Sequence, residues 1–444
     1  MGVKNGLAES LNAMRQIASN EFQEVVPVVD ENTSIESYSA PLLNMPKLFN
    51  EFCDVLVQRI VYTQLESKIY KNPLKVLEGD AIPLGYLGQE IFVNPTEGRD
   101  FDPDDFSGAL KKYESDTKVQ YMYINFDKQY PVTIIRQSLK QAFVSWNALE
   151  EYITGITNSL YNGYYIDEYN NTKGLVTNAY RSNAVQIGKI DAPTTTELAR
   201  KFVEKARTYF LNFQTPSSEF NAWKKIGGYG REIVTFTEPE NIVMLIRNDI
   251  RANIDVNVLA TAFNLDRTTL LGNILPVNNF DILDKFGHKV FDGSKILGII
   301  CDKRWFRIKN QDMFMDEFRN ANNRSMNYYL NVIKMFNYSF FANAVVFATE
   351  EPQIAITGLD FKAPEGISIL NVGDEEGLDI TVTPGSANTP AITYETSNRA
   401  VFTVEKDVND DRHCLITATG KGTATLTAKA GNVSATVSVT VENE

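Results

Sequence analysis

The sequence predicts an α+β protein that is followed by a separate all-β domain. Residues 138–163 repeat apolar side chains at helical spacing, and residues 235–300 alternate short apolar strands with a helix. Residues 350–444 instead form short alternating segments punctuated by Gly, Pro and Asn, which is typical of an all-β fold. At 444 residues the chain is long enough for two or three domains, each with its own core.

Charge and aromatic content both change near residue 350. From Glu350 onward the chain carries 15 acidic and 6 basic residues, a net charge of −9, and the other 41 acidic and 37 basic residues precede it. Of the 49 aromatic residues, only three lie in this last segment: Phe361, Tyr394 and Phe402. We therefore expect a domain boundary between residues 349 and 350.

Residues 1–60 show short helical patterns on either side of the polar stretch VVDENTSIESYSAP. We interpret this segment as an N-terminal arm with short helices. A flexible linker fits the same pattern equally well.

Residues 72–135 contain two strand-like segments, NPLKVLEGDAIPLGYLGQEIFV and KVQYMYINFDKQYPVTII, on either side of the acidic stretch DFDPDDFSG. Two strands that flank a polar tip predict a long hairpin arm.

The aspartates of this tip have part of a calcium-binding pattern. Asp100, Asp102 and Asp104 have the required alternate spacing, but Asp105 stands where the loop needs Gly and Lys111 where it needs Glu. We therefore interpret the tip as a solvated loop without a metal.

The clearest single element is a helix predicted for residues 138–163. Ser138 and Gln141 have the spacing of a capping box, and Asn162-Gly163 would end the helix. One face carries apolar residues at steps of three and four: Leu139, Phe143, Trp146, Leu149, Ile153, Ile156 and Leu160. At about 1.5 Å per residue such a helix would be on the order of 36 Å long, enough to serve as the spine of a domain.

A second helix and an α/β segment are predicted after it. The helix TTTELARKFVEKARTYFLNF begins with a Thr194/Glu197 capping box. Its expected buried face consists of Leu198, Phe202, Ala206 and Tyr209. The strand NIVMLI, the helix IRANIDVNVLATAFN and the strand LGNILPV then predict an α/β subdomain over residues 235–300. Residues 301–349 are aromatic and β-branched, and we expect long strands that return to an earlier layer.

The C-terminal segment ITATGKGTATLTAKAGNVSATVSVTV predicts a β-hairpin. Ala424, Leu426 and Ala428 alternate with threonines, and after a turn at Gly431-Asn432 apolar residues again alternate with Ser and Thr. About 90 residues of this kind fit one immunoglobulin-like sandwich.

Side chains for catalysis or metal binding are few, and we expect no catalytic, cofactor-binding or metal-binding residues. The three cysteines, Cys53, Cys301 and Cys414, lie far apart and support neither a disulfide framework nor a zinc site. Of the two histidines, His288 and His413, the second adjoins Cys414, but adjacent residues of a strand point to opposite faces.

The other candidate motifs of the sequence also favour a structural protein. GGYGRE at residues 227–232 lacks the Lys and the hydroxyl residue of a phosphate-binding loop. Acidic pairs such as Glu150-Glu151 and Asp167-Glu168 are expected in any chain with 56 acidic residues. Basic runs are limited to Lys111-Lys112 and Lys224-Lys225, so sequence-specific nucleic-acid binding is not predicted.

The sequence is compatible with three classes of function. The first is a self-assembling structural protein, and the second is a secreted adhesin or surface-layer protein with an Ig-like tail. The third is an enzyme, such as a glycan hydrolase with an appended Ig module. The sequence has no apolar run of signal-peptide length and no stretch of transmembrane length, which opposes the adhesin. The lack of a nucleophile or carboxylate context opposes the enzyme.

Several segments in a fixed order resemble one family. They are NPLKVLEGDAIPLG (72–85), LKQAFVSWNALEEYITGITNSLYN (139–162), DVNVLATAFNLDRTTLLGN (255–273), DKRWFRI (302–308) and NYYLNVIKMFNYSFFANAVVF (327–347). These segments are similar to the major capsid proteins of short-tailed, Salasvirus-like bacteriophages with protein-primed DNA replication. The block TYETSNRAVFTVEKD…LITATGKGTATLTAKAG resembles a bacterial Ig-like group 2 domain, with Tyr394 where such modules often have Trp.

The resemblance implies the tailed-phage major capsid (Johnson) fold, with peripheral and axial domains. It implies an N-terminal arm (1–60) and a shell core (61–349) that contains an extended loop (72–135), a spine helix (138–163), an axial domain (235–300) and return strands of the peripheral domain (301–349). The Ig-like group 2 domain would be residues 350–444, facing outward for surface decoration or host attachment.

The implied partners are copies of the chain itself, in the pentamers and hexamers of a head shell, together with a scaffolding protein, the portal or connector, head fibres and packaged double-stranded DNA bound non-specifically. No membrane partner and no cofactor are implied. The expected location is the virion capsid, assembled in the host cytoplasm.

Overall fold

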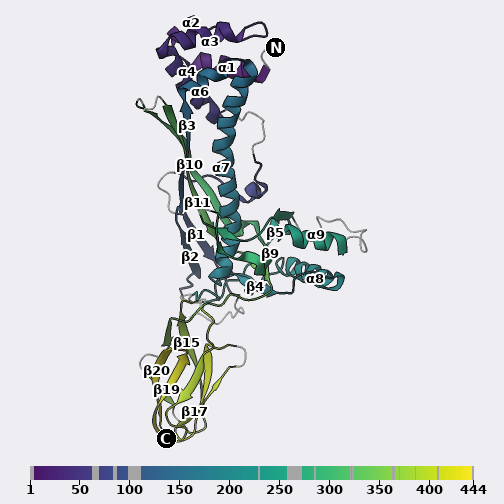
Figure 1. Ribbon diagram of the computed structural model, residues 1–444. Coiled ribbons are helices and arrows are strands. Elements are labelled where there is room, and N and C mark those ends of the chain that lie inside the picture. The colour runs from purple at the N-terminus through teal and green to yellow at the C-terminus, as the bar shows by residue number, and fades with distance from the viewer. Residues whose placement is uncertain are drawn as a thin grey trace. The chain divides into compact units, whose positions relative to one another are not determined.

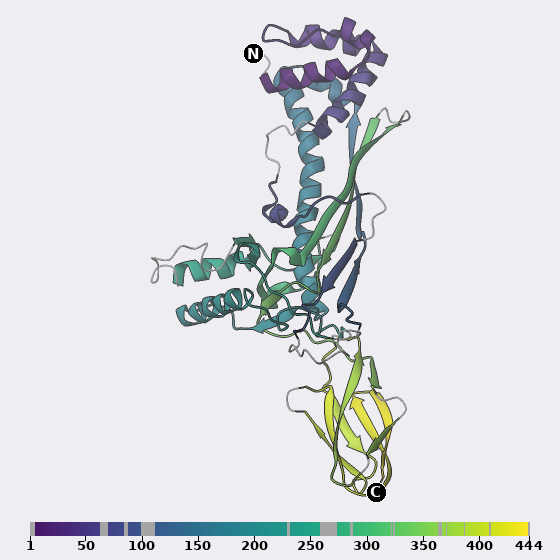
Figure 2. The same ribbon diagram turned by 180° about the vertical axis from the view of Figure 1, so that it is seen from behind.

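The computed structural model describes residues 5–442 apart from 63–69, 84–87, 99–111, 229–230, 258–272, 285–286, 321, 323–324, 363–365, 370, 386 and 408–409 (Figures 1 and 2). Two predictions therefore lie outside the described residues: the acidic tip of the hairpin arm, and most of the DVNVLATAFNLDRTTLLGN segment. The chain divides into two compact units. Unit 1 contains residues 1–88, 122–172 and 307–337, and unit 2 contains residues 89–121, 173–306 and 338–444.

Unit 1 begins with four helices: α1 (Asn5–Ile17), α2 (Asn20–Val25), α3 (Ile35–Asn44) and α4 (Pro46–Tyr62). Side-chain caps start two of them, because the hydroxyls of Ser19 and Ser34 accept hydrogen bonds from the amides of Phe22 and Ser37. Apolar residues of the helices are buried, among them Leu11, Leu42, Leu48, Phe49 and Phe52. The prediction of short helices is confirmed for the described residues, and the flexible linker is wrong because these side chains pack into a core.

The predicted helix 138–163 is wrong at both ends. The chain forms α6 (Arg136–Ala142), breaks, and then forms the 36-residue helix α7 (Trp146–Arg181). The Ser145 hydroxyl caps α7 by accepting a hydrogen bond from the Ala148 amide at 3.1 Å. The helix ends before Asn183, whose φ of 50° is the left-handed conformation of a helix C-terminus.

Asn162-Gly163 does not end α7 because this part of the helix packs closely against a strand. A Cβ atom on Gly163 would lie 3.3 Å from the ring of Tyr130. The predicted buried face is confirmed, since all seven of its residues are at most 8% exposed: Leu139, Phe143, Trp146, Leu149, Ile153, Ile156 and Leu160.

The sheet of unit 1 has three strands in the order β10-β11-β3: β3 (Phe126–Ile135), β10 (Phe306–Asn320) and β11 (Ser325–Tyr338). Strands β11 and β3 pair antiparallel, with Ser325 opposite Ile135 and Lys334 opposite Phe126. A short 3₁₀ helix, Pro73–Leu77, precedes a parallel bridge between Glu78 and Ile308 at the start of β10. The predicted long return strands are thus confirmed for β10 and β11.

Unit 2 contains a five-stranded mixed sheet in the order β4-β12-β9-β5-β6. Its strands are β4 (Gln186–Lys189), β5 (Ile242–Arg247), β6 (Asn273–Val277), β9 (Ile296–Asp302) and β12 (Ala344–Ala348). Helix α9 (Asn248–Asn257) connects β5 to β6, which pair in parallel, so the predicted α/β alternation is confirmed. A minor two-stranded sheet joins β7 (Ile282–Leu283) and β8 (Lys289–Phe291).

Helix α8 (Thr196–Asn212) contributes to the core of this sheet through Ala199, Phe202, Ala206 and Phe210. The predicted face was partly wrong, because Leu198 and Tyr209 are only half-buried. The N-cap is Thr195 rather than Thr194, and its hydroxyl accepts a hydrogen bond from the Leu198 amide at 3.3 Å. The start of the helix is therefore one residue later than the capping-box spacing suggested.

The predicted hairpin arm over residues 72–135 is confirmed only next to the acidic tip, because residues 73–77 form a 3₁₀ helix and β3 pairs with β11. The two strands that flank the tip do pair with each other. They are β1 (Gly88–Val93) and β2 (Thr117–Met122), and together they form a two-stranded sheet.

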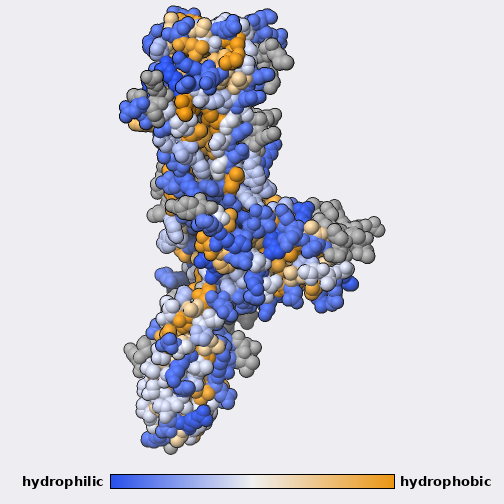
Figure 3. Space-filling view, viewed as in Figure 1, coloured by the Kyte–Doolittle hydropathy of each residue, from blue (hydrophilic) through white to orange (hydrophobic). Residues whose placement is uncertain are grey.

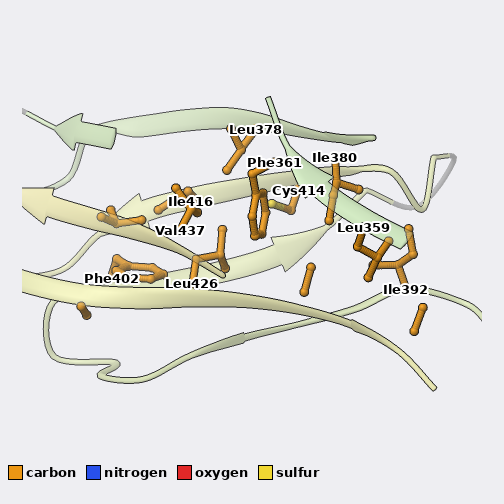
Figure 4. Close-up of a cluster of buried hydrophobic side chains, with 14 of the residues drawn as sticks. Leu359, Phe361, Leu378, Ile380, Ile392, Phe402, Cys414, Ile416, Leu426 and Val437 are labelled. Atoms are coloured by element: carbon orange, nitrogen blue, oxygen red, sulfur yellow. The ribbon is translucent and has the colours of Figure 1, made fainter. Parts of the chain in front are cut away.

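The C-terminal part of the chain forms two four-stranded sheets, with strand orders β13-β15-β18-β17 and β14-β20-β19-β16. The strands are β13 (Gly358–Phe361), β14 (Ile367–Ile369), β15 (Glu375–Thr383), β16 (Thr393–Thr396), β17 (Phe402–Lys406), β18 (His413–Ala418), β19 (Gly422–Ala430) and β20 (Val433–Val441). Side chains of both sheets meet in one hydrophobic cluster, which Figure 4 shows around Phe402, Ile416, Leu426 and Val437.

The predicted C-terminal hairpin is confirmed. Strands β19 and β20 pair from Gly422–Val441 to Ala430–Val433, and Gly431 turns between them at a φ of 60°. Ala424, Leu426 and Ala428 are buried in the cluster, as the alternation predicted.

Candidate assembly surfaces and a buried ion network

A buried ion network joins three parts of unit 1. Lys334 lies in the middle of β11 and its side chain is fully buried. Its ammonium group pairs with the carboxylate of Glu168 on α7, which is 2% exposed, and with Glu78 Oε1 at 3.0 Å. A charge this deep in the fold requires a partner, because moving an unpaired charge out of water costs several kcal/mol.

Three further groups donate hydrogen bonds to the Glu168 carboxylate. The Tyr164 hydroxyl donates to Oε1 at 2.8 Å, Asn72 Nδ2 donates to Oε2 at 2.9 Å, and Lys75 Nζ donates to Oε1 at 3.2 Å. Lys75 also pairs with Glu78 at 2.5 Å, so the network contains two ammonium groups and two carboxylates. The network therefore attaches residues 72–78 to both α7 and β11.

These contacts determine the protonation of Glu168. Burial by itself would raise the pKa of this carboxyl group, but the ion pair and hydrogen bond with Lys334, the hydrogen bond from Asn72 and the charge of Lys75 outweigh burial and lower the pKa to about 2. The neighbouring Asp167 has a different role at the surface, where Lys128 Nζ lies 2.7 Å away and the Tyr130 hydroxyl donates a hydrogen bond. The two residues of one acidic pair thus differ in function because the helix turns one inward and the other outward.

The structural role of Glu168 was not predicted from the sequence, although one signal there points to it. Lys334 is the only charged residue of the largely apolar stretch YYLNVIKMF, where a charge can be buried only if a carboxylate meets it. The sequence does not show which of 56 acidic residues supplies that carboxylate.

A second cluster of polar contacts lies in unit 2 and involves the DKRWFRI and FANAV segments. The buried Asp302 carboxylate accepts hydrogen bonds from the Thr237 hydroxyl at 3.0 Å and from Arg304 Nη2 at 2.7 Å. The Asp302 amide donates to the Asn343 carbonyl at 2.9 Å, and Trp305 stacks on Tyr338 with ring centroids 5.2 Å apart. These contacts hold the end of β9 to Thr237 and Asn343 and pack Trp305 on Tyr338.

The β1–β2 sheet exposes several apolar side chains on one of its faces. The outward face carries Ile91, Val93, Val119 and Tyr121, with exposed fractions of 58, 53, 36 and 74%. The opposite face buries Met122 together with the polar Lys118 and Gln120, which are 4, 9 and 9% exposed. We call the four apolar residues the outer face of the β1–β2 sheet.

The buried polar residues of this sheet have partners in unit 2. Gln120 donates to the Tyr338 carbonyl at 2.8 Å and accepts from the Phe340 amide at 2.9 Å, and Lys118 pairs with Asp116 at 2.6 Å. Because an isolated sheet buries its apolar face and exposes its polar one, the outer face is a candidate contact surface. Figure 3 shows apolar residues at several places on the face of the molecule that it draws.

The side chains considered for chemistry lie apart from one another. Cys53, Cys301 and Cys414 are buried free thiols, and burial raises the pKa of Cys53 and of Cys414 to about 12. His413 Nδ1 lies 2.8 Å from Asp379 Oδ1 at the surface, whereas Cys414 points into the hydrophobic cluster, as predicted from strand alternation. Among the described residues, no three His, Cys, Asp or Glu side chains gather as a metal site would require, and no helix is both long and apolar enough to span a membrane.

Comparison with known proteins identifies the family. A family model of the Phi29-like phage major capsid protein matches residues 11–348. The chain is 31% identical over 359 residues to the major capsid protein of Bacillus phage B103, covering 79% of this chain and 76% of that protein. It is 27% identical over 351 residues to the major capsid protein of Streptococcus phage Cp-1, covering 77% of this chain and 94% of that protein.

A solved structure agrees with this result at the level of the fold. A chain from the capsid of Staphylococcus phage Andhra matches with a TM-score of 0.52 and 12% identity, over 65% of this chain and 87% of that one. The family model alone covers most of the chain, so the adhesin and enzyme alternatives are wrong. The chain belongs to the Phi29-like phage major capsid proteins, structural proteins that assemble with copies of themselves into the shell of the phage head.

Proposed function

We propose that the elements of this subunit have the roles of a tailed-phage capsid protein as follows. Helices α1–α4 are the N-terminal arm, residues 72–135 are the extended loop, and α7 is the spine helix. Residues 235–300 form the axial domain, and β10 and β11 belong to the peripheral domain. In this assignment the buried ion network fixes the start of the extended loop to the spine helix.

The exposed apolar face of the β1–β2 sheet is the observation that carries this proposal. Four apolar side chains of this small sheet face solvent, although their burial would be favourable. A protein that assembles with its own copies would bury the outer face of the β1–β2 sheet against a neighbouring subunit. The β1–β2 sheet of the extended loop would therefore act in assembly, whereas residues 72–78 and β3 also belong to the fold of their own subunit.

Charged residues on the outer face should stop assembly without unfolding the subunit. In the variant Val93→Asp/Tyr121→Asp, both side chains are more than half exposed, so we expect a change in the free energy of unfolding within about 0.5 kcal/mol at each position. Buried against a neighbour, each carboxylate would be unpaired and costly. We expect soluble, folded subunits that form no shells in negative-stain electron microscopy.

The matched control for this experiment is Val372→Asp, which charges an exposed apolar residue of the C-terminal part. If the control forms shells and the double variant does not, the result supports a contact between the outer face of the β1–β2 sheet and a neighbouring subunit. Normal shell yield from the double variant would show that the outer face stays in solvent.

We further propose that residues 350–444 form an Ig-like group 2 sandwich on the outside of the shell. The two four-stranded sheets and their shared hydrophobic cluster support a sandwich. Tyr394, at the position where such modules often have Trp, packs against the cluster, and its hydroxyl donates to the Asp411 carbonyl at 2.9 Å. The net charge of −9 would be repelled by packaged DNA, which favours an outward position for surface decoration or host attachment.

A chain that ends at Glu351 should still assemble. The Tyr180 hydroxyl donates to the Glu350 carbonyl at 2.8 Å and Lys295 pairs with the Glu350 carboxylate, so a chain ending at Glu351 keeps contacts that one ending at Thr349 would lose. We expect this chain to form shells in the presence of the scaffolding protein, and sedimentation with electron microscopy would measure the yield. A folded subunit that forms no shells would place the C-terminal part among the shell contacts.

The remaining partners are proposed from the same assignment. A shell of this kind requires a scaffolding protein during assembly and a portal or connector at one vertex, and its outer surface could carry head fibres. The part of the chain before residue 350 has nearly balanced charges, which fits non-specific contact with packaged double-stranded DNA without strong binding.

A further inference from the structure

Strand β10 forms one edge of the three-stranded sheet of unit 1, because the order β10-β11-β3 leaves one of its sides without a neighbouring strand. The beginning of this edge is covered, since the carbonyls of Ile308 and Asn310 accept hydrogen bonds from the amides of Gly79 and Ile82 at 2.9 Å. From residue 312 to residue 320 the described part of the chain supplies no backbone partner on this side. Such an edge presents N–H and C=O groups that can pair with another strand.

The alternation of the strand identifies the residues whose backbone groups point to this edge. The carbonyls of Ile308 and Asn310 point there, so the backbone groups of the following even-numbered residues point there too. Two of these residues also expose apolar side chains, because Phe314 is 41% and Phe318 is 60% exposed. If two copies of this edge paired with each other, even-numbered residues would therefore form the hydrogen-bonded pairs.

Two charged residues at the end of β10 lack a partner in the described part of the chain. Glu317 and Arg319 are both accessible to solvent, and among the described residues neither lies within ion-pair distance of an opposite charge. Partial burial and the nearby charge of Asp54 raise the pKa of the Glu317 carboxyl group. An arginine from another chain would therefore stabilise the ionised form of Glu317.

These charges select one register for a symmetric pairing. An antiparallel pairing centred on Phe318 places Glu317 opposite the partner's Arg319, and it brings the two Phe318 rings together. Registers centred on neighbouring positions place like charges opposite each other: Asp316 on Asp316, Glu317 on Glu317, or Arg319 on Arg319. Opposite charges across two strands stabilise a pairing and like charges destabilise it, so the register centred on Phe318 is favoured.

We propose that the β10 strands of two copies of the chain pair antiparallel across a two-fold axis, over residues 316–320 and centred on Phe318. The contact joins the three-stranded sheets of the two copies into one continuous sheet. It uses the same surface on both copies, as a two-fold axis requires, and each Phe318 is buried against its equivalent. The inference deepens the proposed function, because it rests on assembly from copies of the chain and adds a contact separate from the outer face of the β1–β2 sheet.

Cysteine cross-linking tests the register. Residues of a hydrogen-bonded antiparallel pair have Cα atoms about 5.5 Å apart, which is within the range that a disulfide spans. Shells of Phe318→Cys, assembled with the scaffolding protein and then oxidised, should therefore shift from monomer to covalent dimer on a non-reducing gel. The native thiols Cys53, Cys301 and Cys414 are buried and should not contribute.

The matched control is Phe314→Cys, which places a thiol at another exposed position of the same strand. In the proposed register Phe314 lies opposite Asn322, so the two introduced thiols would be about 26 Å apart at about 3.3 Å per residue. This variant should remain monomeric on the gel. Intact Phe318→Cys shells without dimers, or equal amounts of dimer from both variants, would overturn the proposal.

Charge exchange provides a second measurement, which also decides the case in which Phe318→Cys forms no shells. Glu317→Arg alone places arginine opposite arginine, and Arg319→Glu alone places glutamate opposite glutamate, so each should lose shell formation. The double variant Glu317→Arg/Arg319→Glu restores both pairs with the charges exchanged and should regain shells. Normal shells from both single variants, or a folded double variant that forms none, would contradict the pairing.

The failure of this inference differs from the failure of the proposed role of the β1–β2 sheet. Normal shells from Val93→Asp/Tyr121→Asp, together with dimers from Phe318→Cys, would overturn only the contact of the outer face. Loss of shells in Val93→Asp/Tyr121→Asp, together with normal shells from both single charge variants of β10, would overturn only the β10 pairing.

Discussion

Replacing Lys334 with methionine should lower the free energy of unfolding of the subunit by about 3–5 kcal/mol. Methionine fills a similar volume, but it removes the buried ammonium group between the carboxylates of Glu168 and Glu78 and leaves only the half-exposed Lys75 to pair with both. Since domains are stable by only about 5–15 kcal/mol, much of the variant should be insoluble, and the soluble part should unfold at lower urea concentration.

Two further variants check the cause of this loss. Lys128→Met removes the exposed ion pair with Asp167, one residue before Glu168, and should cost less than about 1 kcal/mol. Lys334→Met/Glu168→Gln also removes the carboxylate charge that loses its Lys334 partner, and it should recover part of the free energy of unfolding. A loss for Lys334→Met no larger than that for Lys128→Met would contradict the network.

The same network predicts a pH dependence. The pKa of Glu168 is lowered from its usual 4.5 to about 2 in the folded subunit, so its ionised form stabilises the fold at all pH values above about 4.5. This contribution is lost as the pH falls from about 4.5 to 2, because the unfolded chain then binds a proton that the folded chain does not. The unfolding free energies of the parent and of Lys334→Met, measured by urea titration at several pH values, should therefore converge over this range.

Replacing Trp146 with alanine should lower the free energy of unfolding by about 3–5 kcal/mol. Trp146 is 6% exposed at the start of α7, where its ring lies 5.6 Å from that of Tyr38 on α3. Its indole N–H donates to the Thr33 carbonyl at 3.2 Å. Alanine would leave a cavity between the N-terminal helices and α7, and it would remove the partner of that carbonyl.

Limited proteolysis adds a readout specific to this contact, because α1–α4 should be cleaved sooner in the variant than in the parent. Val144→Ala is the control: Val144 lies two residues away but is 76% exposed, so its truncation should change the unfolding free energy by less than about 0.5 kcal/mol. Equal protease resistance of Trp146→Ala and the parent would show that this contact does not hold the helices in place.

The sequence by itself determined most of the secondary structure, because that information is local. The spacing of three and four between seven apolar residues, from Leu139 to Leu160, identified the buried side of α6 and α7. The alternation of apolar and polar residues on both sides of Gly431 identified the β19–β20 hairpin. The order of the quoted segments also led to the family, which the match over residues 11–348 confirmed.

Only the tertiary structure decided where helix α7 ends and which charges are buried. Gly163 resembles a stop signal in the sequence, yet it lies within the helix because β3 brings the Tyr130 ring to within 3.3 Å of the place of its missing Cβ. Glu168 is indistinguishable from Asp167 until α7 turns it toward Lys334, which is 166 residues away in the chain. Contacts between distant segments depend on how the elements pack, and no local pattern of residues contains that information.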